Sequence, residues 1–193
     1  MALLNEEEVR SAARRTTDRL AKAATAVLKE ESSTAKQRFD IFLSHSIKDA
    51  EIVLGVMRII ENTGKTVYVD WVHDPKLDRS NVSPNTARAL RARMTQCDAL
   101  LYLQSRQSSS SRWMPWELGY FDGYNGNVAI LPVVTERGAT EFKGEEYLGL
   151  YPFADVATIR GTSNNELWIN RSADDSVSFG AWKTASDKLR PTR

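Results

Sequence analysis

One carboxylate lies within an aromatic cluster in the middle of the chain. Glu117 stands close to two tryptophans, a tyrosine and a phenylalanine, shortly after the serine run 108–111. The stretch 111–123 predicts the opening turns of a helix, where unpaired backbone N–H groups and the helix dipole favour an anion. We therefore expect Glu117 to be ionised and oriented. Such a group beside ring surfaces suits a ligand with an aromatic base and a sugar that becomes cationic during reaction.

The elements around this stretch alternate between strands and helices. Strands are predicted at 39–43, 66–69, 99–103, 128–134 and 156–160, and helices at 49–62, 85–96 and from 111 onward. This alternation predicts an α/β fold with a mostly parallel sheet and helices on both faces. Ligands of such folds bind beyond the carboxyl ends of the strands. That rule selects Ser44 with His45, Asp70 with Trp71, and the segment 104–111.

The two ends of the chain extend this pattern. Residues 3–31 are rich in helix formers and carry a narrow apolar stripe, which predicts an N-terminal amphipathic helix. The serine-rich stretch after it serves as a linker, so we divide the chain into 1–34 and a main domain at 35–193. At the C-terminal end, 167–170 is expected to pair with the last predicted strand as a hairpin, and 179–189 to form a short helix.

Composition narrows the function classes. The 193 residues carry a formal charge of +1, which argues against bulk electrostatic binding to nucleic acid or an anionic membrane. One cysteine and two histidines make no spacing typical of a metal site, so no metal is expected. Neither a secretory signal nor an apolar run of the ~20 residues needed to span a membrane is evident. The sequence therefore predicts a cytoplasmic protein.

Three motifs, in order, resemble a bacterial Toll/interleukin receptor (TIR) domain of the type found in Thoeris antiphage systems. Phe39–His45 is similar to the family's first box. Val67–Asp70 and the polar segment after it occupy the place of the second strand and the long BB loop. Ser111, Trp113 and Glu117 match a Ser-x-Trp-Cys-x-x-Glu pattern, with Met114 in place of the cysteine. The BB loop lacks the Arg-Asp-x-x-Pro-Gly signature of receptor adaptors.

The resemblance implies a flavodoxin-like TIR fold with a five-stranded sheet, plus the N-terminal helix. It also implies an NAD+ glycohydrolase or cyclase that releases nicotinamide and makes ADP-ribose or a cyclic or conjugated isomer, with NAD+ as substrate and no cofactor. Glu117 would be the catalytic residue. Substrate contacts are expected from residues near the strand ends and the helix start, namely Ser44, His45, Asp70, Trp71, Ser108, Ser111 and Trp113. Ser111 is equally an N-cap, and the tryptophans are equally packing residues.

Two other functions remain open at this stage. One is a non-enzymatic TIR module that assembles with other copies, for which Glu117 would be dispensable. The other is an enzyme resembling nucleoside deoxyribosyltransferases, which use a glutamate as covalent nucleophile. A homo-oligomer formed through TIR surfaces or the N-terminal helix is expected in each case. For the cyclase, a downstream effector that senses the nucleotide product is also expected.

Overall fold

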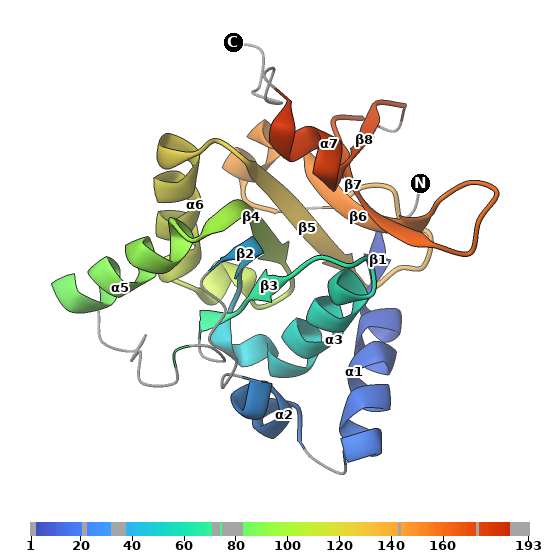
Figure 1. Cartoon of the computed structure of the whole chain (residues 1–193), viewed down its shortest axis with the longest axis horizontal. Helices are drawn as coiled ribbons and strands as arrows, with labels where there is room; N and C mark the ends of the chain where they lie inside the picture. Colours follow the sequence, from blue (N-terminus) through green and yellow to red (C-terminus); the bar gives the residue numbers. More distant parts are fainter. Residues whose placement is uncertain are drawn as a thin grey trace.

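The computed structural model describes residues 3–20, 23–31, 38–70, 74, 83–142, 144–172 and 174–185. In this part of the chain eight strands form one sheet, in the order β3-β2-β4-β5-β6-β7-β8 with β1 beside β5 (Figure 1). The strands are β1 (Leu4–Asn5), β2 (Phe39–Ser44), β3 (Val67–Tyr68), β4 (Cys97–Gln104), β5 (Val128–Val134), β6 (Phe153–Thr158), β7 (Asn165–Asn170) and β8 (Ser176–Ser178).

The centre of the sheet is parallel, as predicted. β3, β2, β4, β5 and β6 pair in parallel and form the expected five-stranded core. β6 and β7 pair antiparallel, so the predicted hairpin forms, and β8 continues the sheet beyond it. β2 lies between β3 and β4, so the chain leaves β2 first to one side and then to the other. The crevice at this change of direction is where α/β folds bind ligands.

Helices cover both faces of the sheet and enclose two cores. One core joins α1 (Glu6–Leu20), α2 (Ala24–Glu31), α3 (Ala50–Glu61) and α7 (Phe179–Thr184) to one face. The other joins α5 (Pro84–Met94) and α6 (Trp113–Tyr124) to the opposite face. β4 serves both, because Leu101 and Leu103 face the first core while Leu100 and Tyr102 face the second. Burial on both faces explains the continuous apolar runs in the sequence.

The N-terminal segment differs from the single helix predicted over residues 3–31. It begins with β1, whose residues pair with Val133 and Val134 of β5, and continues as two helices. Asn5 ends the strand: its Nδ2 donates to the carbonyl of Thr135 at 3.1 Å, and its Oδ1 accepts from the backbone N–H of Glu7 at 3.0 Å. This asparagine therefore ties the first turn of α1 to the end of β5.

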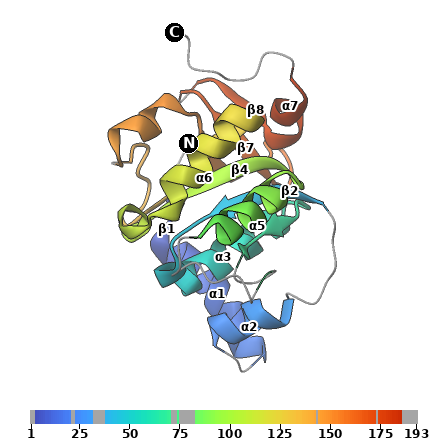
Figure 2. The same ribbon diagram turned by 90° about the vertical axis from the view of Figure 1, so that its left-hand side faces the viewer.

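Three short 3₁₀ helices lie in the segments that connect strands of the sheet to the elements that follow them. They are η1 (Ile47–Asp49), η2 (Ser108–Ser110) and η3 (Glu146–Leu150). The turned view shows α1, α2 and α3 gathered on one side of the sheet (Figure 2). Within the ranges given above, no helix combines the length and the apolar character that crossing a bilayer would need.

Candidate active site

Glu117 is held by a hydroxyl from the neighbouring strand. It is the fifth residue of α6, and Ser44 is the last residue of β2. The Ser44 hydroxyl donates to Oε2 of Glu117 at 2.6 Å, and both residues have an exposed fraction of 0%. A hydrogen bond to an ionised carboxylate is among the stronger ones in proteins, and it fixes the orientation of the group. The structure therefore joins two of the predicted site residues, which are 73 positions apart in the sequence.

His45 and Asp70 form a second buried pair beside them. Nδ1 of His45 lies 2.7 Å from the carbonyl oxygen of Leu43, and Nε2 lies 3.5 Å from Oδ1 of Asp70. A carbonyl can only accept, so Nδ1 carries a proton and Nε2 is directed at the carboxylate. The exposed fractions are 1% for both residues. In this arrangement both ring nitrogens meet protein groups, and a contact of His45 with substrate stays a prediction.

Ser108, Ser111 and Trp113 lie on the path from β4 into α6. The Ser108 hydroxyl is buried, with Oε1 of Gln104 at 2.8 Å and the carbonyl oxygen of Ser105 at 2.9 Å. Ser111 Oγ accepts from the backbone N–H of Met114 at 3.3 Å, which is a capping contact. Trp113 is 8% exposed and meets Trp116 edge to face. Trp71, also a predicted site residue, lies outside the described residues.

Two groups near the site were absent from the sequence prediction. Tyr102 of β4 is directly opposite Ser44 in the ladder. Burial, a hydrogen bond with Tyr147 and the nearby charges of Glu145 and Glu117 raise the pKa of this phenol, so it is neutral. No local pattern could have identified Tyr102 as a site residue, because in the sequence it is one of several buried residues in an apolar strand.

The second missed group is Asp49, at the start of α3. Its Oδ2 accepts from the Ser105 hydroxyl at 2.5 Å, so the segments that follow β2 and β4 are tied together at the carboxyl ends of these strands. Burial raises the pKa of Asp49 above its ordinary value. A serine directly after a strand and an acidic residue at a helix start were the only sequence signals for this contact.

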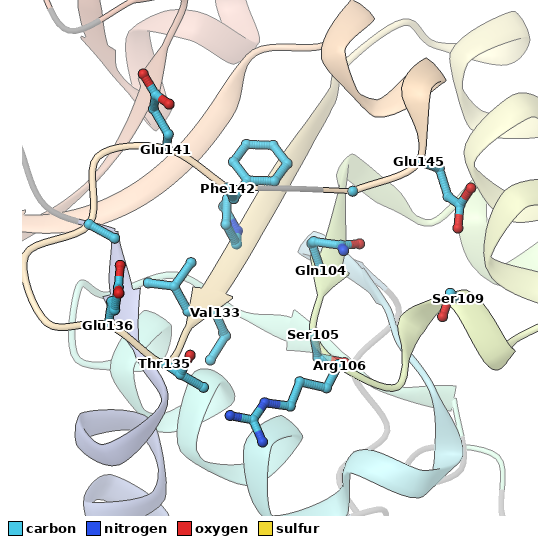
Figure 3. A pocket seen from close by; sticks show the side chains of 14 residues that line it. Gln104, Ser105, Arg106, Ser109, Val133, Thr135, Glu136, Glu141, Phe142 and Glu145 are labelled. Carbon is cyan, nitrogen blue, oxygen red and sulfur yellow. The ribbon is translucent and has the colours of Figure 1, made fainter.

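A cavity of about 670 Å³ lies at the carboxyl ends of β4 and β5. Its walls include Gln104, Arg106, Phe142 and Glu145, and Figure 3 shows their side chains around one space. Glu117 does not line it. The two places are nevertheless connected through β4, because Gln104 follows Tyr102 by two residues and so lies on the same face of the strand. Three glutamates and one arginine line the cavity, which makes its wall acidic overall.

The part of the chain that the structure describes holds no group of three or more histidine, cysteine, aspartate or glutamate side chains suited to a metal ion.

The fold and the three motifs define a class of protein. Residues 41–166, more than half of the chain, match the model of the TIR domain family. The chain belongs to this family. The matched range includes Ser44, Asp70 and Glu117, and it begins after the N-terminal helices.

Two curated relatives are similar in sequence. The chain is 49% identical over 144 residues to "Probable 3' cyclic ADP-D-ribose synthase ThsB'" of Bacillus cereus (strain MSX-D12), and the match covers 75% of each protein. It is 30% identical over 86 residues to "Putative cyclic ADP-D-ribose synthase TIR2" of Cytobacillus dafuensis, a match that covers 44% of this chain and 23% of that protein. The predicted kinship with Thoeris-type TIR proteins is confirmed by the first relative.

Proposed function

We propose that the protein is a TIR-domain enzyme of antiphage defence that cleaves the nicotinamide–ribose bond of NAD+ and makes a cyclic ADP-ribose. The observation that carries the proposal is the buried carboxylate of Glu117, held by Ser44 at the carboxyl end of β2. Support also comes from the relative named as a cyclic ADP-ribose synthase, which shares 49% identity over three quarters of both chains.

The chemistry of the leaving group explains why one carboxylate is enough. Glycosidases use a second carboxyl group to protonate the leaving oxygen. Nicotinamide in NAD+ is a pyridinium cation, and it departs as a neutral molecule when the C–N bond breaks and the electron pair stays on nitrogen. The remaining positive charge develops on the ribose. A preoriented carboxylate stabilises that charge without reorganising during the reaction, and Glu117 supplies it.

The other residues orient this step. Ser44 fixes one oxygen of Glu117, and His45, the next residue along the chain, pairs with Asp70. Ser108, Ser111 and Trp113 shape the start of α6, and Trp113 offers an aromatic surface on which a base can stack. Each of these roles, and a contact of Trp71 with substrate, is part of the proposal.

The fate of the ribosyl cation sets the product. Capture by water gives ADP-ribose, whereas capture by a hydroxyl of the same nucleotide gives a cyclic isomer. In both routes the O–H group that forms the new C–O bond releases one proton. We propose the cyclic product because both relatives are named as cyclic ADP-ribose synthases. We propose further that the reaction uses no cofactor, takes place in the cytoplasm, and serves a separate effector that senses the product.

Assembly with other copies is proposed to use TIR surfaces. The sequence suggested two routes, the TIR surfaces and the N-terminal helix. The helix is the weaker candidate because most of its apolar surface is already buried. Val9, Ala12, Ala13 and Thr16 of α1 are already buried within the same chain. α1 packs on α3 and contributes to the first core.

The direct test is incubation of the protein with NAD+, comparing wild type with Glu117→Gln, with mass spectrometry of the nucleotides. The glutamine keeps the size of the side chain and removes its charge. We expect nicotinamide release and a cyclic ADP-ribose from wild type, and a rate lower by about 10²-fold or more in the variant. Nucleotide extracts of phage-infected cells that express each form supply the triggered condition.

The alternatives give different results in the same assay. Defence against phage that survives Glu117→Gln without any NAD+ consumption would identify a non-enzymatic assembly module. Cleavage of nucleosides in preference to NAD+ would identify an enzyme of the deoxyribosyltransferase kind.

A further inference from the structure

Asp74 is anchored to helix α5 by a two-pronged ion pair. Nε of Arg93 donates to Oδ2 of Asp74 at 2.6 Å, and Nη2 donates to Oδ1 at 2.8 Å. The hydroxyl of Tyr68 donates to the same Oδ2 at 2.6 Å. A planar guanidinium that meets both carboxylate oxygens fixes distance and orientation together, which a lysine cannot do.

The anchor is built into the core on its other side. Tyr68 is 1% exposed, and its ring stacks on Phe42 of β2 at 5.3 Å between centroids. The guanidinium of Arg93 also lies 5.9 Å from the centre of the Tyr68 ring. The hydrogen bonds to Asp74 raise the pKa of Arg93 above its ordinary value. The three residues therefore form one charged and aromatic unit rather than a loose surface pair.

This unit is joined directly to the candidate active site. The backbone N–H of Asp74 donates to the carbonyl oxygen of Asp70 at 2.6 Å. Asp70 is thus fixed on one side by Tyr68 in the sheet, two residues earlier, and on the other by Asp74, which Arg93 of α5 holds. Its carboxylate is the group that Nε2 of His45 faces at 3.5 Å. Arg93 itself lies 48 positions from His45 in the sequence and touches neither ring nitrogen.

We infer that Arg93 and Asp74 are positioning residues for NAD+ cleavage, which act by holding Asp70 against His45 beside Ser44 and Glu117. The inference rests on the proposed function. In physical terms, the ion pair fixes the backbone at Asp70 and the Asp70 carboxylate fixes the imidazole of His45. His45 directly follows Ser44, which orients Glu117. Small displacements of these groups are costly to catalysis because the reacting atoms must stay aligned.

The test compares Arg93→Gln, Arg93→Lys and Asp74→Asn with Arg88→Gln. Arg88 lies on the same helix, is exposed, and bonds only Asn85 among the contacts described. We expect kcat for nicotinamide release to fall on the order of 10-fold in Arg93→Gln and Asp74→Asn, with a smaller change in KM. Arg93→Lys keeps the positive charge but cannot bond both carboxylate oxygens at once. Its kcat should lie between that of wild type and that of Arg93→Gln. Arg88→Gln should behave as wild type.

A double variant separates a positioning unit from two independent effects. If Arg93 and Asp74 act only through each other, Arg93→Gln combined with Asp74→Asn lowers kcat by the same factor as either change alone. A product of the two factors would contradict the inference. Circular dichroism melting of each variant identifies any that fails to fold, and the comparison then rests on Arg93→Lys.

Nuclear magnetic resonance gives a readout that does not depend on activity. The chain has two histidines, so replacing His73 leaves the ring signals of His45 alone. We expect these signals and their pH titration to move in Arg93→Gln and to stay in place in Arg88→Gln. Unmoved His45 signals in a folded Arg93→Gln protein would overturn the inference, even if kcat fell. If the His45 signals move in Arg93→Gln while the wild-type protein never consumes NAD+, the positioning unit is supported and the proposed function is rejected.

Discussion

The hydrogen bond between Ser44 and Glu117 is the most consequential contact at the scale of single residues. Both groups are fully buried, and the carboxylate takes its orientation from the hydroxyl. Each residue was a candidate from sequence, one as the end of a strand and the other as the start of a helix. In this bond Glu117 supplies the carboxylate and Ser44 orients it.

Replacement of Ser44 by alanine should therefore lower the rate without unfolding the protein. The loss of one hydrogen bond to a charged group is worth about 1.5–3 kcal/mol, which corresponds to a fall of about 10- to 100-fold in kcat. Initial rates of nicotinamide release at saturating NAD+ measure this. Ser46→Ala is the matched control. Ser46 lies two residues further along the chain and is also buried, but within the described residues its hydroxyl accepts a hydrogen bond only from the backbone N–H of Lys48, at 3.4 Å. Equal losses in the two variants would argue against an orienting role for Ser44.

At the scale of elements, α1 is an integral part of the domain. It crosses α3 at Gly55, where an added Cβ would collide with the carbonyl oxygen of Val9. Arg10 of α1 also pairs with Glu51 of α3 and with Glu6, so charges at the rim support the apolar crossing. The family match begins at residue 41, yet the first core includes Val9 and Ala13. The N-terminal helix and the TIR domain therefore fold against each other.

A pair of glycine substitutions tests this close crossing. Gly55→Ala should lower the free energy of unfolding by about 1–3 kcal/mol, because the helices must move apart. Gly123→Ala, in α6, should instead raise it by about 0.5–1 kcal/mol, since nothing lies near the added methyl group and alanine favours the helix. Urea unfolding of both variants measures the difference. A neutral effect of Gly55→Ala would mean that α1 can leave α3 at little cost.

At the scale of the whole molecule, ionisable side chains that are buried or half-buried differ in how they are paired. Lys183 of α7 bonds Asp40 and Asp98, each at 2.9 Å, and so ties the C-terminal helix to the amino ends of β2 and β4. Asp155 of β6 is different. It is 0% exposed and accepts from Nδ2 of Asn170 at 3.2 Å. Its Oδ2 has no hydrogen-bond partner among the described residues.

The free energy of unfolding should depend on pH because of this buried acid. Burial raises the pKa of Asp155, so the folded protein keeps a proton that the unfolded chain loses near pH 4. The stabilising contribution of the side chain is therefore complete below that pH and is lost as the pH rises through the folded pKa. Asparagine cannot ionise. Asp155→Asn should thus gain stability relative to wild type as the pH rises, by about 1–3 kcal/mol at pH 7.

Urea unfolding at pH 4 and pH 7 measures that gain. Asp174→Asn, at an exposed position after β7, is the control and should show the same small effect at both pH values. A difference between Asp155→Asn and wild type that does not depend on pH would show that Asp155 does not titrate with folding.

Much of the architecture follows from local pattern. β5 was predicted with its observed bounds, and α3 and α5 to within one or two residues at each end. The β6–β7 hairpin was predicted from its two strands, with the first placed two to three residues too late in the chain. These elements could be predicted because strand propensity, helical periodicity and turn chemistry depend on residues that are close together in the chain. The motif around Glu117 is local in the same sense. Sequence alone therefore determined the parallel core, the class of protein and the catalytic candidate.

Contacts between distant segments were decided only by the tertiary structure. Nothing in the sequence of Leu4–Asn5 predicts a strand. These two residues form a strand only because they pair with the backbone at the end of β5. The pairing of His45 with Asp70, the fork from Arg93 to Asp74 and the docking of α1 on Gly55 are of the same kind. Each depends on which side chains the packed sheet and helices bring together, and that choice depends on three-dimensional packing, which spacing along the chain does not record.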